Sequence, residues 1–112
     1  MAVEIEEIAV GAVTVVVVQG RLDGLAAPAL DDRLAGLTTR GTKLVLDMAG
    51  LDYASSAGLR VLLKAAKQTK ASKGRFALAA ITPTVEKIFE ISGFTTIFDI
   101  YPDRDQAAAA IA

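Results

Sequence analysis

Strand-like and helix-like segments alternate along most of this chain. Residues 12–20 (AVTVVVVQG) form a run of β-branched residues, whose stiff side chains suit a pleated sheet. The nearly continuous apolar character of this run predicts a strand that is covered on both faces. An alternating segment from Val3 to Val10 predicts a half-exposed strand before it, and Gly11 allows a turn between them. We therefore expect the fold to begin with an antiparallel hairpin.

The next segment changes to the period of a helix. Leu30, Leu34 and Leu37 recur on one helical face. Pro28 is tolerated only in the first turn of a helix, so this helix should begin near Ala27.

A second helix should begin near Ala57, with an apolar stripe on one face and a polar stripe on another. It should end near residues 73–74, where Gly74 can take the left-handed conformation. The apolar stripe consists of Leu59, Leu62, Leu63 and Ala66, and the polar stripe of Arg60, Lys64 and Lys67.

Two further helices are predicted in the last third of the chain. One has Thr82 as its cap and Pro83 in its first position, and Gly93 followed by Phe94 should end it. The other is the short alanine-rich segment that follows Asp103.

Three more strands are expected at residues 42–50, 75–81 and 95–101. The order is then ββαβαβαβα, which indicates an α/β fold with a mixed, mainly parallel sheet of about five strands and about four helices. The length fits a single domain over residues 1–112.

Composition excludes several classes of function. A net charge of −1 argues against a general nucleic-acid-binding protein. The acidic, alternating N-terminus does not resemble a signal peptide. The longest apolar run, around residues 13–18, is far shorter than the ~20 residues of a membrane-spanning helix. A cytoplasmic protein without direct membrane insertion is the expectation.

The segment ASSAG contains two adjacent hydroxyls, Ser55 and Ser56, between a strand-like and a helix-like run. Nucleophilic catalysis would need a base, but the chain has no histidine, and the nearby lysines lie on a solvated helix face. The segment lacks the first glycine of a nucleophile elbow, and the chain contains neither a Walker loop nor a calcium-loop motif. We therefore expect no catalytic residue, no metal site and no cofactor. One serine suffices to cap a helix, so the other could present its hydroxyl to solvent, and the residues alone leave a cap and a functional site both open.

Four segments resemble a STAS domain: residues 20–23 (GRLD), 44–63 (LVLDMAGLDYASSAGLRVLL), 82–94 (TPTVEKIFEISGF) and the terminal helix. The resemblance is greatest to the single-domain anti-sigma-factor antagonists of bacteria. It implies a non-catalytic partner of an anti-sigma factor that is also a serine kinase.

In that family the kinase phosphorylates the serine two residues before the motif glycine, and a serine phosphatase reverses the reaction. That position is Ser56 here, with Ser55 as the less favoured alternative. Many relatives have aspartate at position 55 and glycine at position 60. The resemblance implies a monomer or weak dimer whose partner surface includes Asp23, Ser55, Ser56, Ala57, Gly58, Arg60 and Lys64.

Two other functions are compatible with the sequence. The chain could be a STAS partner subunit of a lipid or anion transport assembly. It could also be a small hydrolase that uses Ser56 with a lysine base.

Overall fold

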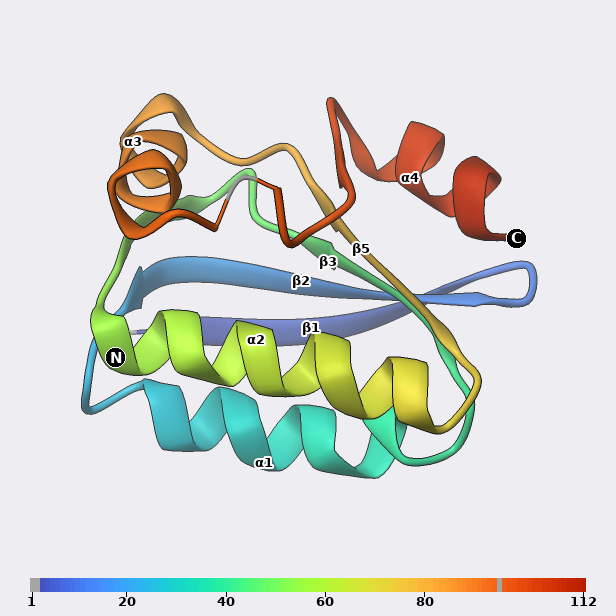
Figure 1. Ribbon diagram of the computed structural model, residues 1–112. Coiled ribbons are helices and arrows are strands. Elements are labelled where there is room, and N and C mark those ends of the chain that lie inside the picture. The colour runs from blue at the N-terminus through green and yellow to red at the C-terminus, as the bar shows by residue number, and fades with distance from the viewer. Residues whose placement is uncertain (1–2, 95) are drawn as a thin grey trace.

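The structure of the chain is a computed structural model that describes residues 3–94 and 96–112 (Figure 1). Within these residues, strands and helices alternate around a mostly parallel sheet, so the expected mixed α/β fold class is confirmed. The elements are β1 (Val3–Val10), β2 (Val13–Leu22), α1 (Ala27–Thr38), β3 (Lys43–Asp47), β4 (Leu51–Ala54), α2 (Ser56–Ala71), β5 (Arg75–Ala79), α3 (Pro83–Ser92), β6 (Ile100–Tyr101) and α4 (Arg104–Ile111).

The long strand β2 organises the sheet. It pairs antiparallel with β1, which is the expected hairpin. Its first half also pairs parallel with β3, and its last residues pair parallel with β4. The sheet continues from β3 through β5 to β6, giving the order β1-β2-β3-β5-β6 with β4 attached to β2. The carboxyl ends of β2 and β4 therefore lie next to each other, and the serine segment follows β4 directly.

Strand β4 was not predicted from the sequence, so the described residues contain six strands where about five were expected. Leu51–Ala54 is only four residues long, which is too short to show a clear alternation or apolar run. Pairing with Arg21 and Leu22, across a register shift at Gly20, defines this strand instead. Gly20 has a φ of 102°, a backbone conformation that favours glycine.

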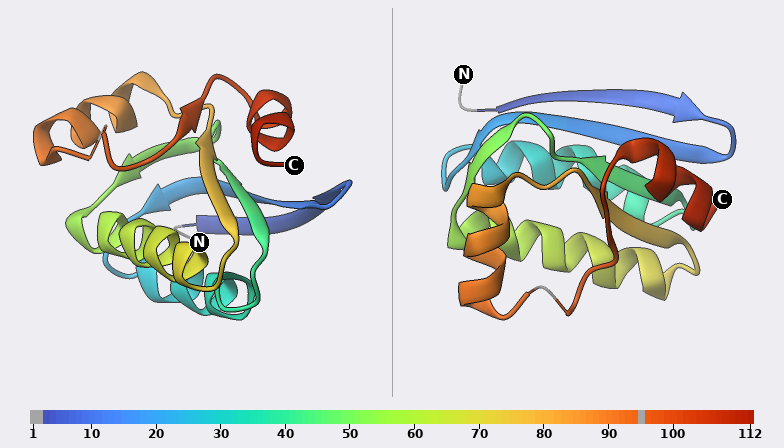
Figure 2. Two further views of the ribbon diagram at one scale, coloured as in Figure 1. Left: turned by 45° about the vertical axis from the view of Figure 1, so that its right-hand side comes forward. Right: turned by 90° about the horizontal axis from the view of Figure 1, so that it is seen from above.

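Helices cover both faces of the sheet, as Figure 1 and the left view of Figure 2 show. Helices α1 and α2 lie side by side on one face, α4 lies on the other, and α3 packs against β4. Successive valines of β2 point to opposite faces. Val16 and Val18 belong to the core beneath α1 and α2, whereas Val13, Val15 and Val17 belong to the core beneath α4. The apolar run is nearly continuous because both faces of β2 are covered.

Most helix boundaries agree with the capping residues in the sequence. Helix α1 begins at Ala27 with Pro28 in its first turn. The Thr82 hydroxyl accepts a hydrogen bond at the start of α3, and Gly93 ends that helix with a φ of 74°. The Asp103 carboxylate caps α4 by accepting a hydrogen bond from a backbone N–H in its first turn (2.8 Å).

The prediction for the end of α2 is wrong in one respect. The residue with left-handed geometry is Lys73, with a φ of 66°, and not Gly74. Gly74 is needed for space, because a Cβ on it would collide with the Thr42 carbonyl oxygen. Close chain packing, not a helix stop, therefore explains the glycine.

The last strand is shorter than the predicted range of 95–101. Strand β6 comprises Ile100–Tyr101, and Thr95 lies outside the described residues. Phe98 is buried, with its ring centre 5.6 to 6.3 Å from those of three other phenylalanines. Aromatic packing around Phe98, more than strand pairing, fixes this segment.

Candidate functional site

The two serines have different environments at the start of α2. Ser55 precedes the helix in an extended conformation, and its Oγ accepts a hydrogen bond from the Gly58 backbone N–H (3.2 Å). This N-cap satisfies one of the unpaired N–H groups at the helix start. Ser56 is the first residue of the helix and is exposed. Ser55 thus has the capping role, and the Ser56 hydroxyl is accessible to solvent.

Gly58 lets the start of α2 pack directly on the end of β2. It is buried, and a Cβ built on it would lie 2.7 Å from Leu22 Cγ and 2.8 Å from the Leu22 carbonyl oxygen. The same carbonyl accepts a hydrogen bond from the Ser55 backbone N–H (2.9 Å). A side chain at position 58 would therefore displace both serines. Gly58 positions the site, and its burial leaves it no surface to offer a partner.

Asp23 follows β2 as Ser55 follows β4, so both residues lie at the same edge of the sheet. The carboxylate of Asp23 is engaged within its own loop. Its Oδ1 accepts hydrogen bonds from the backbone N–H groups of Leu25 (3.1 Å) and Ala26 (2.9 Å). Asp23 therefore fixes the loop between β2 and α1 beside the serine segment.

Leu25 lies in this loop and is 90% exposed. A single exposed leucine is common on protein surfaces, but this one is held in place by Asp23 at the edge that carries Ser56. Leu25 was not predicted from the sequence as part of this surface. The available signal was an apolar side chain beside Gly24, before the helix begins, where no helical period requires it.

A shallow groove of about 320 Å³ runs from this loop between the first turns of α1 and α2. Arg60 is exposed on the α2 side and has no ion-pair partner among residues 3–94 and 96–112. Lys64, by contrast, pairs with Asp31 of α1 (3.2 Å between Nζ and Oδ2) and so connects the two helices. The groove is lined by Gly24, Ala27, Pro28, Asp31, Ala57, Arg60, Val61 and Lys64.

The structure thus gathers the residues singled out from the sequence at one end of the molecule. Ser56, Ala57 and Arg60 are available to a partner, whereas Gly58 is buried and Lys64 is paired within the chain. An exposed serine and an exposed arginine beside a shallow groove suit protein docking. In the described part of the chain, no cluster of three or more histidine, cysteine or acidic side chains could hold a metal ion. The same residues contain no helix that is long and apolar enough to span a bilayer.

A second polar arrangement, which the sequence did not suggest, lies at the end of β3. Asp47 is buried, and its Oδ2 forms an ion pair with Arg104 Nε of α4 (2.9 Å). Its Oδ1 accepts a hydrogen bond from the Ala49 backbone N–H (3.1 Å). The pair connects α4 to the sheet, which is a structural role.

A family model for the STAS domain matches residues 2–107. The chain belongs to the STAS domain family. One relative of this STAS domain is BtrV of Bordetella bronchiseptica, provisionally named an anti-sigma factor antagonist; it is 44% identical over 82% of this chain and 80% of its own length. The anti-sigma-B factor antagonist of Bacillus subtilis is 29% identical over 74% of this chain and 76% of its own length.

A crystal structure of an anti-sigma factor antagonist from Mycobacterium paratuberculosis is also similar to this STAS domain. It superposes with a TM-score of 0.87 at 25% identity and covers 97% of this chain and 93% of its own. The resemblance seen in the sequence is therefore confirmed at the level of family and fold.

Proposed function

We propose that this STAS domain is an anti-sigma factor antagonist, a binding module without catalytic activity of its own. The names of its relatives support this role. The observation that carries the proposal is the exposed hydroxyl of Ser56 at the first position of α2, next to a serine that already caps the helix. The partner would be a cytoplasmic anti-sigma factor with serine kinase activity, and Ser56 would be the residue that it phosphorylates.

The position of Ser56 explains how phosphorylation could act without unfolding the domain. A phosphoserine carries a charge of about −1.5 to −2 and three strong acceptor oxygens. At the start of α2 this charge meets backbone N–H groups and the positive end of the helix dipole, so the fold should tolerate it. Release would come from the interface, where the phosphate adds bulk, desolvation cost and repulsion from any nearby acidic group. A loss of ~4 kcal/mol would weaken binding about a thousandfold, and a serine phosphatase would restore the binding form.

The proposed footprint combines the Ser56 loop with the groove between α1 and α2. Leu25 offers an exposed apolar anchor on the β2–α1 loop, and Arg60 offers an exposed charge on α2. Binding energy at protein interfaces is concentrated in a few side chains, among which arginine is enriched, and burial of an exposed leucine adds a hydrophobic contribution. Asp23 and Ser55 would act indirectly, by holding the loop and the helix start.

The hydrolase alternative has little support in the geometry. Lys64, which lies on the polar face of α2, pairs with Asp31 and remains half-exposed. A nucleophilic serine needs a base within hydrogen-bond reach. No hydrogen bond joins the Ser56 side chain to a lysine within residues 3–94 and 96–112.

The proposal is tested by intact-mass measurement after incubation with each candidate anti-sigma kinase and ATP. We expect the mass of one phosphate, mapped to Ser56. Ser55→Ala should still accept the phosphate, and Ser56→Ala should not. If Ser55→Ala is not phosphorylated and Ser56→Ala is, the phosphorylated residue is Ser55. If no kinase modifies the protein, the antagonist role fails in favour of a STAS subunit of a lipid or anion transport assembly.

A second test measures binding to the anti-sigma factor that phosphorylates the protein. Ser56→Ala should bind as the parent does and should not be released by ATP. Leu25→Ala should keep the parent's stability but bind at least about fivefold more weakly, because burial of a leucine side chain contributes ~1 kcal/mol or more. Ile91→Ala is a matched control, since Ile91 is 81% exposed on α3, outside the footprint.

A further inference from the structure

A second hollow lies near the other end of α2. Its volume is about 490 Å³, within the ~300–1,000 Å³ range of small-molecule pockets. At 1.5 Å per residue, the helix separates its centre from Ser56 by roughly 15 Å. The hollow is bounded by the second half of α2, the start of β5 and the segment before β6. Its lining residues are Leu63, Ala66, Lys67, Lys70, Gly74, Arg75, Phe76, Ile97, Phe98 and Asp99.

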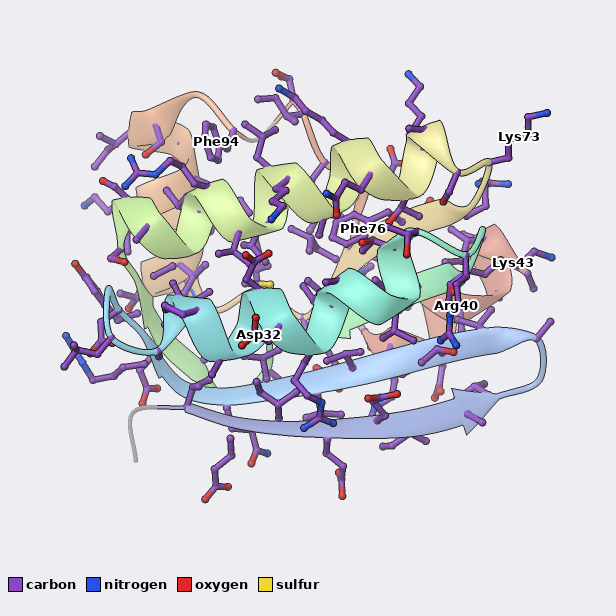
Figure 3. The ribbon with its side chains drawn as sticks, turned by 90° about the horizontal axis from the view of Figure 1, so that it is seen from below. Asp32, Arg40, Lys43, Lys73, Phe76 and Phe94 are labelled. Atoms are coloured by element: carbon purple, nitrogen blue, oxygen red, sulfur yellow. The ribbon has the colours of Figure 1, made fainter. Side chains whose placement is uncertain are left out.

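The floor of the hollow is apolar. Leu63, Ala66 and Lys70 lie about one turn apart on one flank of α2, and the first two are half-buried. Phe76 and Phe98 form the opposite wall, with ring centres 6.3 Å apart. Figure 3 shows Phe76 beside the C-terminal half of α2. Ala66 contributes only a methyl group, so a longer side chain at this position would project into the hollow.

The rim of the hollow is cationic. Lys67, Lys70 and Arg75 are exposed, and none of them forms an ion pair within residues 3–94 and 96–112. Asp99 is the one acidic residue that lines the hollow among those the structure describes. The rim therefore carries a net positive charge, although the whole chain has a net charge of −1.

This charge belongs to a wider basic region. Residues 53–85 contain six lysines and arginines and no acidic residue. Arg40, Lys43 and Lys73 lie at the same end of the molecule as the end of α2 (Figure 3). An anion approaching this end meets a positive field, which raises its local concentration.

We propose that the hollow binds a free medium-chain fatty acid or a closely similar small carboxylate with an unbranched apolar body. The apolar body packs between Leu63, Ala66 and the two phenylalanine rings. The carboxylate lies at the rim, within reach of the flexible lysine side chains, whose stems can pack on apolar surface while their charges remain solvated. This site is separate from the Ser56 surface, and the inference does not depend on the antagonist role.

Both parts of the ligand are required by the lining. A neutral alcohol of the same length would leave the three cations unused, and a short carboxylate would leave the aromatic wall uncovered. The hollow has the size of a single small molecule, which favours a free acid over the surface of a membrane. Anionic lipid vesicles share the acyl and anionic chemistry, so they form a separate arm of the test.

The experiment is a titration of the full chain with decanoate below its micelle concentration, followed by backbone amide NMR. We expect saturable shift changes centred on residues 63–70, 75–76 and 97–99. Decanol and acetate should each bind at least threefold more weakly than decanoate. Vesicles of phosphatidylglycerol should not bind the protein more strongly than decanoate does.

Three variants localise the site. Ala66→Leu should abolish decanoate binding, because it fills the floor while leucine remains a good helix former. Lys67→Gln combined with Lys70→Gln should weaken binding about tenfold, since each exposed charge contributes about threefold. Lys87→Gln is the matched control, because Lys87 is an exposed lysine on α3 that does not line the hollow. Thermal unfolding of each variant verifies that it is folded.

Several results would overturn the proposal. Non-saturable shifts, or shifts centred elsewhere, would show that no fatty-acid site exists here. Unchanged binding by a folded Ala66→Leu variant would place the ligand outside the hollow. Binding to vesicles or to an acidic peptide, without binding to decanoate, would show that the basic region is a docking surface for a macromolecule instead.

Discussion

Replacing Gly58 by alanine should destabilise this domain, although alanine is the better helix former. A Cβ at position 58 would lie 2.7 Å from Leu22 Cγ, whereas ordinary contacts begin at 3.4 Å, so one group must move by about 0.7 Å. Leu22 is fully buried, and its carbonyl oxygen is hydrogen-bonded to the Ser55 N–H. Neither the Leu22 side chain nor its carbonyl oxygen can therefore move away freely from a Cβ at position 58. Overpacking lowers the free energy of unfolding by ~1–3 kcal/mol. The higher helix propensity of alanine offsets only about 0.5–1 kcal/mol of this loss.

The net loss should therefore be about 0.5–2 kcal/mol, measured as the free energy of unfolding in urea with circular dichroism. Gly36→Ala is the matched control, because Gly36 is exposed inside α1 and a Cβ there meets nothing within 4 Å. This control should be more stable than the parent by about 0.5–1 kcal/mol. If the free energy of unfolding falls in Gly58→Ala and rises in Gly36→Ala, the difference is due to the contact with Leu22 and not to helix propensity. Equal stabilisation in both variants would refute the reasoning.

Three further changes test the roles assigned to individual side chains. Ser55→Ala should lower the free energy of unfolding by ~1 kcal/mol, because the Gly58 N–H loses its cap; an unchanged urea midpoint would contradict the capping role. Ser56→Asp should melt within a few degrees of the parent, because a negative charge is favourable in the first turn of a helix. The same variant should bind the anti-sigma factor poorly in calorimetry. A strongly destabilised variant would show that position 56 does not tolerate a negative charge. Arg104→Ala should cost ~1–3 kcal/mol in urea unfolding, because Asp47 remains buried without its cation, and Arg104→Lys should recover part of that loss.

Local sequence determined where most elements begin and end. Pro28 and Gly93 mark a helix start and a helix end by their own backbone preferences, and these preferences act within a few residues. The valine run of β2 likewise predicts a strand that is covered on both faces, since its apolar side chains alternate between two cores. The serine segment could be singled out as a candidate site because a helix cap needs only one of its two hydroxyls.

Contacts between distant residues decided the rest. Strand β4 exists because three of its four residues pair with the end of β2, and no local period predicts that pairing. The same pairing brings the Ser55 backbone N–H to the Leu22 carbonyl oxygen. Ser55 therefore caps the helix, and Ser56 remains exposed. Gly74 looked like a helix stop until its contact with the Thr42 carbonyl was known.

The sequence by itself therefore determined the family and the order of the elements except strand β4, and it drew attention to the two adjacent serines. Only the tertiary structure decided which serine is exposed, that Lys64 is paired with Asp31, and that Leu63 and Phe76 line the same hollow. The physical reason is range. Backbone preferences and hydrophobic periods act over a few residues, whereas burial, ion pairing and cavity shape depend on which distant segments the fold brings into contact.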